Sequence, residues 1–340
     1  MKKNVKIDEL CFNEGDMKEE ELGCIHCQKC TKNCDFLKKY DMDLDDFSSR
    51  DDLAYHCFLC GKCKEVCPKD IDGREIALKM RKKHIRKSNN LLKDKDNTLL
   101  LKEKNPYKFA NYKYSNKKSV LFPGCNFISF YPRTSENLIG LLKKYDIGAI
   151  LDCCQKPIDE LGLEDDANKN LQNLKNSIEE NNIEEIIVVC PNCYYFLKSK
   201  LKVNIITIYD KLEELNLGKR INKISLPIYY PCPDRKDKLF FNTIKPFIEG
   251  KIKDSFKDTQ CCGLGGCASS KERQISTKFA KSVVQAGEED LYTYCASCVG
   301  NFRRKGFLNS YHLLSLILDV EEEVPLGMKS LLNRAMFKFK

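Results

Sequence analysis

Cysteine is the residue type best placed to do chemistry in this 340-residue chain, which contains 20 of them. Two runs share the spacing Cys-x-x-Cys-x-x-Cys-x-x-x-Cys, and their members are Cys24, Cys27, Cys30 and Cys34, then Cys57, Cys60, Cys63 and Cys67. This spacing matches the bacterial 4Fe-4S run, in which three closely spaced thiolates bind one cluster and the fourth cysteine can reach a second cluster. The two runs therefore predict two cubane 4Fe-4S clusters.

Zinc and disulfides explain this spacing less well. A zinc ion needs only two Cys-x-x-Cys pairs, or cysteine with histidine, and disulfide frameworks are typical of secreted proteins. Residues 1–10 are charged and lack the apolar core of a secretory signal. His26 and His56 lie beside predicted ligands, but we expect packing rather than ligation because each run already supplies four thiolates. Asp35 stands where Pro68 follows the second run, so the first run departs from the pattern.

Two further groups of five cysteines share a second pattern, which is a lone cysteine, an adjacent pair and a Cys-x-x-Cys. The members are Cys125, Cys153, Cys154, Cys190 and Cys193, then Cys232, Cys261, Cys262, Cys295 and Cys298. Matching members are offset by 107, 108, 108, 105 and 105 residues, which indicates a duplicated unit. Five thiolates exceed the four that zinc or a cubane needs, and an adjacent pair could let one sulfur bridge two irons.

Apolar runs of strand type lead toward these cysteines, and amphipathic helical patterns lie between them. The predicted strands cover residues 119–122, 186–189, 203–208, 226–230 and 291–294. The helical patterns are Ala167, Leu171, Leu174 and Ile178, then Ala268, Ile275, Phe279 and Val283. Strands that alternate with helices predict parallel α/β layers, in which ligands bind at the carboxyl ends of strands. We therefore expect each five-cysteine group at one edge of a small sheet.

The cysteine groups resemble those of the CCG-domain iron–sulfur proteins. Cys261-Cys262-Gly263, followed by Leu264-Gly265-Gly266 and later by Cys295-Ala296-Ser297-Cys298, matches the family motif, whereas the first copy reads Cys153-Cys154-Gln155. The module order resembles the fused catalytic subunit of heterodisulfide reductase, and also the iron–sulfur subunits of glycolate oxidase and anaerobic glycerol-3-phosphate dehydrogenase. This resemblance implies a non-cubane 4Fe-4S cluster at each five-cysteine group. Gln155 leaves zinc as an alternative at the first group.

Together these patterns predict an α+β chain of five segments. They are a helical ferredoxin-like domain with two 4Fe-4S clusters (1–87), a basic linker (88–118), a first α/β CCG domain (119–217), a second α/β CCG domain (218–320) and a C-terminal amphipathic tail (321–340). Both CCG domains are expected to be Rossmann-like. Cys11 and Cys267 fall outside the four groups and are predicted to be simple thiols, although Cys267 lies close enough in sequence to serve the second five-cysteine group.

Charge is unevenly distributed along the chain, whose formal net charge is +9. Residues 74–118 contain 15 Lys and Arg against four Asp and Glu, a difference of +11. This segment is interpreted as solvated surface, as a docking surface for an acidic redox partner, or as a nucleic-acid surface with Tyr107, Tyr112 and Tyr114 among the lysines. We expect no nucleic-acid partner, because charge runs are usually solvated surface.

No apolar run reaches the roughly 20 residues that a membrane-spanning helix needs. The longest candidate, Leu313–Val320, is predicted to be core. The tail at 321–340 combines Met and Leu with Lys and Arg, so it is expected to pack on its own domain, with contact to a partner or membrane surface as the alternative. We expect a cytoplasmic chain, with peripheral contact on the cytoplasmic face of the membrane as the alternative.

The sequence supports three functional hypotheses. In the first, an oxidoreductase subunit relays electrons through two cubane clusters to the CCG sites and reduces a disulfide, as heterodisulfide reductase does. In the second, the chain is an electron-transfer subunit of a flavin-dependent hydroxy-acid or glycerol-3-phosphate dehydrogenase. The third is a non-catalytic metal sensor. The first two imply an anaerobic hetero-oligomer whose redox partner is a flavoprotein, a ferredoxin or a membrane cytochrome subunit.

Overall fold

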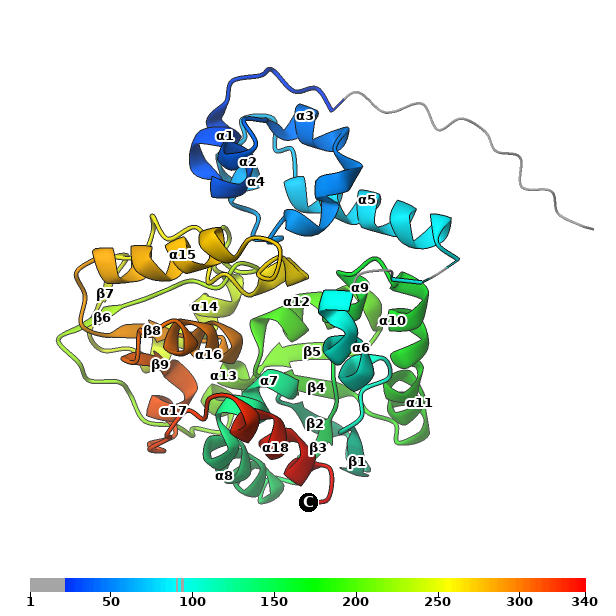
Figure 1. Cartoon of the computed structure of the whole chain (residues 1–340). Coiled ribbons are helices and arrows are strands. Elements are labelled where there is room, and N and C mark those ends of the chain that lie inside the picture. Colours follow the sequence, from blue (N-terminus) through cyan, green and yellow to red (C-terminus); the bar gives the residue numbers. More distant parts are fainter. Residues whose placement is uncertain (1–21, 90, 93–94) are drawn as a thin grey trace, which may run out of the picture.

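A computed structural model describes residues 22–340 of the chain, apart from residues 90, 93 and 94. Cys11, with the rest of residues 1–21, lies outside the described residues. The described chain is 49% helix and 11% strand, which confirms the predicted mixture of helix and sheet. Figure 1 shows a helical N-terminal part in blue above two α/β halves, the first in green and the second in yellow and orange.

The N-terminal part consists of several short helices and one longer helix. They are α1 (Lys29–Asn33), α2 (Asp35–Lys39), α3 (Leu44–Ser48), η1 (Asp51–His56), α4 (Lys62–Val66) and α5 (Gly73–Lys87). Asp43 begins α3 with a capping box, and the Asp72 carboxylate accepts a hydrogen bond from the backbone N–H of Arg74 at the start of α5. Phe36 and Phe47 pack edge to face in the small core. The short helices leave the cysteines in loops and helix ends.

The first half is built on a five-stranded sheet of order β1-β3-β2-β4-β5. Its strands are β1 (Asn111–Tyr114), β2 (Ser119–Phe122), β3 (Gly148–Leu151), β4 (Glu185–Val188) and β5 (Asn204–Thr207), of which only β1 is antiparallel to its neighbour. Its helices are α7 (Cys125–Phe130), α8 (Pro132–Lys143), α9 (Lys156–Asp159), α10 (Glu164–Asn170), α11 (Gln172–Glu180), α12 (Pro191–Lys200) and α13 (Ile208–Glu214). Val120, Leu121 and Phe122 are all fully buried, because helices cover both faces of a parallel sheet.

The second half repeats this strand order. Its strands are β6 (Ser225–Pro227), β7 (Lys251–Lys253), β8 (Leu291–Thr293) and β9 (Ser310–His312), and its helices are α14 (Leu239–Ile244), η3 (Lys245–Phe247), η4 (Gly265–Cys267), α15 (Arg273–Gln285), α16 (Ala296–Arg304) and α17 (Leu313–Ile317). The pairs β6–β7 and β8–β9 are parallel, and a parallel bridge between Ile228 and Tyr292 joins them. The resulting order, β7-β6-β8-β9, matches β3-β2-β4-β5, so the duplication seen in the cysteine spacing extends to the strands.

Two predicted helical patterns differ from the structure. Leu171 separates α10 from α11, so the pattern from Ala167 to Ile178 spans two helices rather than one. Ala268 lies in the loop after η4 and does not share a helix with Ile275, which belongs to α15. Leu171 and Ala268 are both buried in the core at a bend of the chain. A buried apolar residue at such a bend continues the spacing of apolar residues that is typical of an amphipathic helix.

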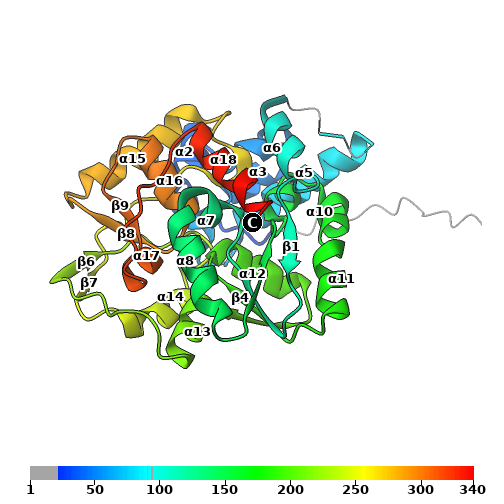
Figure 2. The ribbon, with the colours of Figure 1, turned by 90° about the horizontal axis from the view of Figure 1, so that it is seen from below.

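The predicted linker and tail both pack on the first half. The linker contains η2 (Lys95–Asn97), α6 (Thr98–Lys104) and the strand β1. The tail forms α18 (Met328–Phe337), which packs against α7 of the first half although the second half precedes it in sequence. The Asn333 side chain donates to the Ser129 carbonyl, and the Ser129 hydroxyl donates to the Ser330 carbonyl. Figure 2 shows α18 beside α7 and close to β1.

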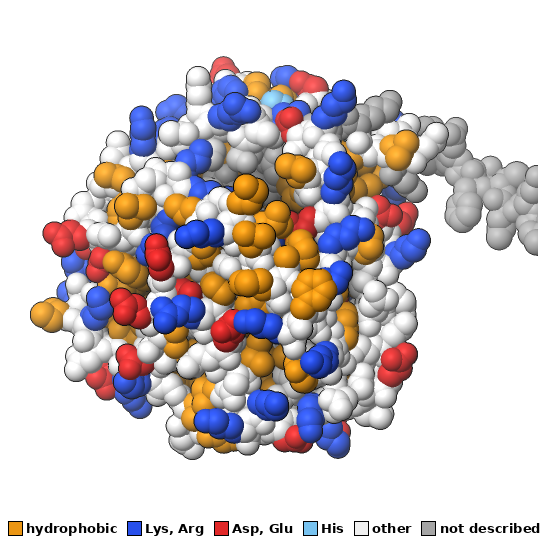
Figure 3. Space-filling model, turned by 60° about the horizontal axis from the view of Figure 1, so that its bottom comes forward, with side chains coloured by type: hydrophobic (Ala, Val, Ile, Leu, Met, Phe, Trp, Pro, Cys, Tyr) orange, Lys and Arg blue, Asp and Glu red, His pale blue; other side chains and the backbone are white. Residues whose placement is uncertain are grey.

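The outward face of α18 is apolar. Met328, Leu332 and Met336 are 79%, 58% and 49% exposed, whereas the polar Ser330 and Asn333 face inward and are buried. Hydrophobic side chains gather near the centre of the molecular face in Figure 3, with Lys and Arg side chains around them. Among the described residues, no helix is both long enough and apolar enough to be a membrane span.

Candidate iron–sulfur sites

The first cysteine run forms an outer site that takes its fourth cysteine from the second run. Cys24, Cys27, Cys30 and Cys67 line one pocket, together with Pro68. Cys30 lies in α1, whose start is set by Gln28 in the left-handed conformation, and Cys67 ends α4. The structure thus brings together three cysteines of one run and the last cysteine of the other, as the spacing predicts for a two-cluster ferredoxin.

The complementary inner site gathers the other four cysteines of the two runs, which are Cys34, Cys57, Cys60 and Cys63. Burial and the nearby Cys60 thiol raise the pKa of Cys34, and burial with the nearby Cys34 thiol raises that of Cys63. Gly73 begins α5 against this site, and a Cβ at that position would lie 2.7 Å from the Cys63 sulfur. The absence of a side chain at Gly73 therefore allows the helix to approach the thiols closely.

The first five-cysteine group lies at the carboxyl ends of β2, β3 and β4. Cys125 begins α7 after β2, Cys153 and Cys154 follow β3, and Cys190 begins α12 after β4, with Cys193 in its first turn. The sulfurs of Cys125 and Cys153 are 3.9 Å apart. Hydrogen bonds with Cys153 and Cys193 lower the pKa of the Cys154 thiol to about 5. This is the sheet edge that the strand pattern predicts for a ligand site.

The second five-cysteine group has the same arrangement on β6, β7 and β8. Cys232 follows β6, Cys261 and Cys262 lie in the loop after β7, and Cys295 begins α16 with Cys298 in its first turn. The sulfurs of Cys232 and Cys261 are 4.0 Å apart, close to the separation in the first group.

The residue after each adjacent cysteine pair has a left-handed backbone. Gly263 has φ 84°, and its N–H donates to the Cys261 sulfur at 3.2 Å. A Cβ at Gly263 would lie 2.8 Å from the Ser276 hydroxyl, so glycine is needed at this position. Gln155 in the first group has φ 65° and begins α9. The replacement of glycine therefore leaves the local backbone shape of the first group intact.

Comparison with known protein families agrees with this geometry. The profile of the 4Fe-4S dicluster domain matches residues 23–72, and the profile of the cysteine-rich CCG domain matches residues 119–198 and 249–303. The chain is a CCG-domain iron–sulfur protein. The family resemblance carried by the cysteine spacing is thereby confirmed.

Three curated relatives match most of this chain. Uncharacterized iron–sulfur proteins of Methanococcus maripaludis and Methanocaldococcus jannaschii are 26% and 24% identical to this chain, over 89% and 84% of its length and 72% and 68% of theirs. A fumarate reductase (CoM/CoB) subunit of Methanothermobacter marburgensis is 23% identical over 81% of this chain and 66% of the relative.

In this CCG-domain protein, thiols of the second CCG group contact those of the inner site and those of the first CCG group. Cys261 of the second CCG group hydrogen-bonds with Cys60 of the inner site, and this contact lowers the pKa of the Cys60 thiol to about 6. Cys190 of the first CCG group hydrogen-bonds with Cys295 of the second. The Asn192 side chain also donates to the Cys295 sulfur at 3.7 Å. Sulfur contacts therefore run from the inner site through the second CCG group to the first.

Each CCG group also has a cation beside its lone cysteine, which the sequence analysis did not identify. Lys104 Nζ lies 3.1 Å from the Cys125 sulfur, and the Arg235 guanidinium lies 3.6 Å from the Cys232 sulfur. Burial works to lower both pKa values, but the nearby cysteines outweigh it and raise them. The two cations come from unrelated positions, 21 residues before one cysteine and three after the other, so the repeat could not reveal them.

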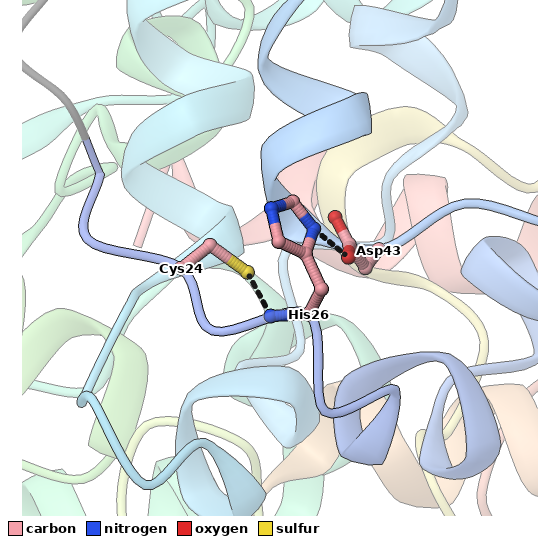
Figure 4. Close-up of side chains that lie close together, drawn as sticks. All are labelled: Cys24, His26 and Asp43. Atoms are coloured by element: carbon pink, nitrogen blue, oxygen red, sulfur yellow. Dashed lines mark hydrogen bonds and ion pairs between the residues drawn. The ribbon is translucent and has the colours of Figure 1, made fainter.

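His26 and His56 are both held by carboxylates. His26 Nδ1 lies 2.9 Å from the Asp43 carboxylate, while its backbone N–H donates to the Cys24 sulfur at 3.4 Å (Figure 4). The hydrogen bond with Asp43 raises the pKa of His26. His56 Nδ1 lies 2.7 Å from the buried Glu272 carboxylate. Cys24, His26 and Asp43 lie close enough to share a metal ion, but Asp43 also caps α3.

The residues at the four groups fit iron–sulfur clusters. Eighteen thiols gather into sets of four, four, five and five, and most of them are buried. Soft thiolates are the ligands that such clusters require. The cations at the CCG groups offset thiolate charge that would otherwise be costly to bury.

Proposed function

We propose that this protein is an electron-transfer subunit of a reductase and that its 18 grouped cysteines hold four iron–sulfur clusters. The proposed ligands are Cys24, Cys27, Cys30 and Cys67 at the outer site, Cys34, Cys57, Cys60 and Cys63 at the inner site, and the two five-cysteine sets at the CCG sites. A bound iron–sulfur cluster accepts and donates single electrons. The chain's own residues exclude water from the sites, supply hydrogen bonds to sulfur and hold cations beside the thiolates.

The contact between cysteine sets is the observation that carries this proposal. Cys261 touches Cys60 across the boundary between the dicluster domain and the second CCG group, and Cys190 touches Cys295 across the boundary between the two CCG groups. A protein that stored metal at separate sites would have no need to bring its thiols together in this way. Close spacing of redox groups is what electron transfer requires.

We propose a disulfide as the substrate class at the CCG sites. A CCG site has five thiols, one more than a cubane cluster needs, which favours the non-cubane cluster that splits a disulfide in heterodisulfide reductase, the enzyme that the module order resembles. One relative is a subunit of a fumarate reductase (CoM/CoB), which favours a reductive role for this chain as well. The alternative is an electron-transfer subunit of a flavin-dependent hydroxy-acid or glycerol-3-phosphate dehydrogenase, in which the same four sites would serve without a substrate of their own.

We propose that a redox partner protein covers the outward face of α18 in a hetero-oligomer. This face exposes several large apolar side chains, and large apolar patches are typical of binding surfaces. Residues 328–340 include four basic and no acidic residues, so an apolar partner groove with an acidic rim would complement them. Because α18 packs on α7, which begins with Cys125, a partner bound here would lie one helix away from the first CCG site.

Metal and sulfide analysis of anaerobically purified protein tests the proposed function. Four clusters predict about 16 irons per chain, and Cys232→Ser and Cys125→Ser variants are each expected to lose the iron of one CCG site. Zinc at the first CCG site would appear as one zinc and about 12 irons. Only about eight irons in the wild type, equal to the dicluster domain alone, would contradict the proposed role of the CCG sites.

A further inference from the structure

The departure of the first cysteine run from its motif has a structural counterpart at the inner site. Asp35 follows Cys34, whereas Pro68 follows Cys67 at the matching position of the second run. The backbone N–H of Asp35 donates to the Gln260 side-chain oxygen at 2.8 Å. Proline has no N–H, so the motif residue could not make this hydrogen bond.

Gln260 uses its amide nitrogen on the inner-site thiols. Nε2 donates to the Cys34 sulfur at 3.4 Å and to the Cys60 sulfur at 3.6 Å. The side chain is 7% exposed, so these contacts are shielded from water. Because the Asp35 N–H binds the oxygen, it fixes which end of the amide faces the sulfurs. The next residue in the chain is Cys261, whose sulfur touches Cys60.

We propose that the Asp35 backbone and the Gln260 side chain form a positioning pair that sets the reduction potential of the inner site, where the dicluster domain meets the second CCG group. This inference rests on the proposed function. Hydrogen bonds to cluster sulfurs stabilise the more negative, reduced state, and are one of the factors that set cluster potentials. Gln260 therefore raises the reduction potential of the inner site. The residue that follows it, Cys261, belongs to the second CCG group.

Substitutions at Gln260 test the donors directly. Gln260→Met removes both N–H donors at similar volume, and Gln260→Glu replaces them with an acceptor or a negative charge. At a fixed solution potential we expect the ratio of reduced to oxidised inner site to fall about tenfold in Gln260→Met, which is 59 mV for a one-electron couple, and further in Gln260→Glu. Potentiometric titration followed by electron paramagnetic resonance measures this ratio, with the outer-site signal as an internal reference that should not move.

A matched pair at position 35 separates the backbone from the side chain. Asp35→Pro removes the N–H, and it is compatible with the fold because Asp35 is the first residue of α2. Asp35→Ala keeps the N–H and removes the same carboxylate, together with its ion pair with Lys278. We expect a lower inner-site potential in Asp35→Pro than in Asp35→Ala, because both variants lose the carboxylate and only the proline lacks the N–H.

The outcomes distinguish this inference from the proposed function. Wild-type protein without clusters in the dicluster domain would overturn both. Full iron content, with the same inner-site potential in the wild type and Gln260→Met and the same potential in Asp35→Pro and Asp35→Ala, would overturn the positioning role alone. If Gln260→Met loses iron, Gln260→Asn and Asp35→Pro supply the comparison, because the shorter amide also withdraws the donors and Asp35→Pro leaves Gln260 in place.

Discussion

The two CCG units share one framework but face different neighbours. In the second unit, the residue before the cysteine pair is Gln260, which reaches the thiols of the dicluster domain. The matching residue in the first unit is Asp152, which accepts a hydrogen bond from the Tyr112 hydroxyl on β1. Burial raises the pKa of Asp152 to about 6. The residue before the cysteine pair therefore contacts the dicluster domain in the second unit and the linker in the first unit.

The two units share the cysteine framework, but the segments around it differ. The Cys261 thiol of the second unit contacts Cys60 of the inner site, whereas the Cys190 thiol of the first unit contacts Cys295 of the second unit. The linker supplies the first unit with a cation, Lys104, and a strand, β1. In the second unit the cation, Arg235, lies within the unit itself.

The largest expected effect comes from removing the sulfur contact between the dicluster domain and the second unit. Cys261→Ser removes a proposed ligand of the second unit together with the sulfur that contacts Cys60, so the second unit should lose its iron and reduction of the first unit by the dicluster domain should slow about 10- to 100-fold. Cys153→Ser, at the matching position, should leave reduction of the second unit unchanged. Rapid-freeze electron paramagnetic resonance of each unit measures these rates. Slower reduction of the second unit in Cys153→Ser would show that the first unit is not the distal one.

Removal of a buried cation should be the next largest effect. Lys104→Met leaves the thiols around Cys125 without their counter-charge, so we expect a loss of about 3 kcal/mol in the free energy of unfolding and loss of metal from the first unit only. Lys102 is exposed on the same helix, so Lys102→Met should change stability by less than about 0.5 kcal/mol. Denaturant titration and metal content supply the measurements. Equal metal loss from both units would contradict separate roles for Lys104 and Arg235.

Glu272 tests the attachment of the dicluster domain to the second unit. Its buried carboxylate contacts Lys39 Nζ and His56 Nδ1 at 2.7 Å and the Tyr40 hydroxyl at 2.8 Å. Burial works to raise the pKa of Glu272, but its hydrogen bonds, with Lys39 first, lower it. We expect Glu272→Gln to cost about 1–3 kcal/mol at neutral pH. Differential scanning calorimetry at neutral pH measures this loss.

The sign of the pH dependence follows from the lowered pKa. The ionised Glu272 contributes full stability above its unfolded-state value of 4.5, and this contribution is lost as the pH falls through the lower folded-state value. Wild type and Glu272→Gln should therefore converge in stability only below about pH 4.5. A constant difference down to pH 2 would show that the carboxylate charge is not the source of the stabilisation.

The smallest effect on stability is expected at the surface of α18. Leu332→Glu should change the free energy of unfolding by less than about 0.5 kcal/mol, because the side chain is exposed, yet it should abolish assembly with the redox partner. Leu308→Glu, at an exposed leucine of the second half, is the control. Analytical ultracentrifugation of the co-expressed complex measures assembly. Retention of the partner by Leu332→Glu would remove α18 from the interface.

The sequence predicted those parts of the fold and sites that depend on local pattern. The strand at 119–122 was predicted because a central parallel strand is apolar at every position. By contrast, β7 alternates Lys251, Ile252 and Lys253 over only three residues, which is too short to distinguish from a loop. The cysteine groups were visible because their spacing repeats. Lys104 and Gln260 were not, since their roles depend on contacts between segments far apart in the chain.

The return of the last helix to the first unit has a consequence for dissecting the protein. Arg334 pairs with Glu103 of α6, and the Asn111 side chain donates to the carbonyl of Phe337, so the final residues complete the surroundings of a unit that begins more than 200 positions earlier. A fragment that ends after β5 and α13 would expose α7 on the side where α18 normally lies. The two halves are thus not structurally independent. A chimaera with a relative would have to take its linker and its C-terminal helix from the same parent.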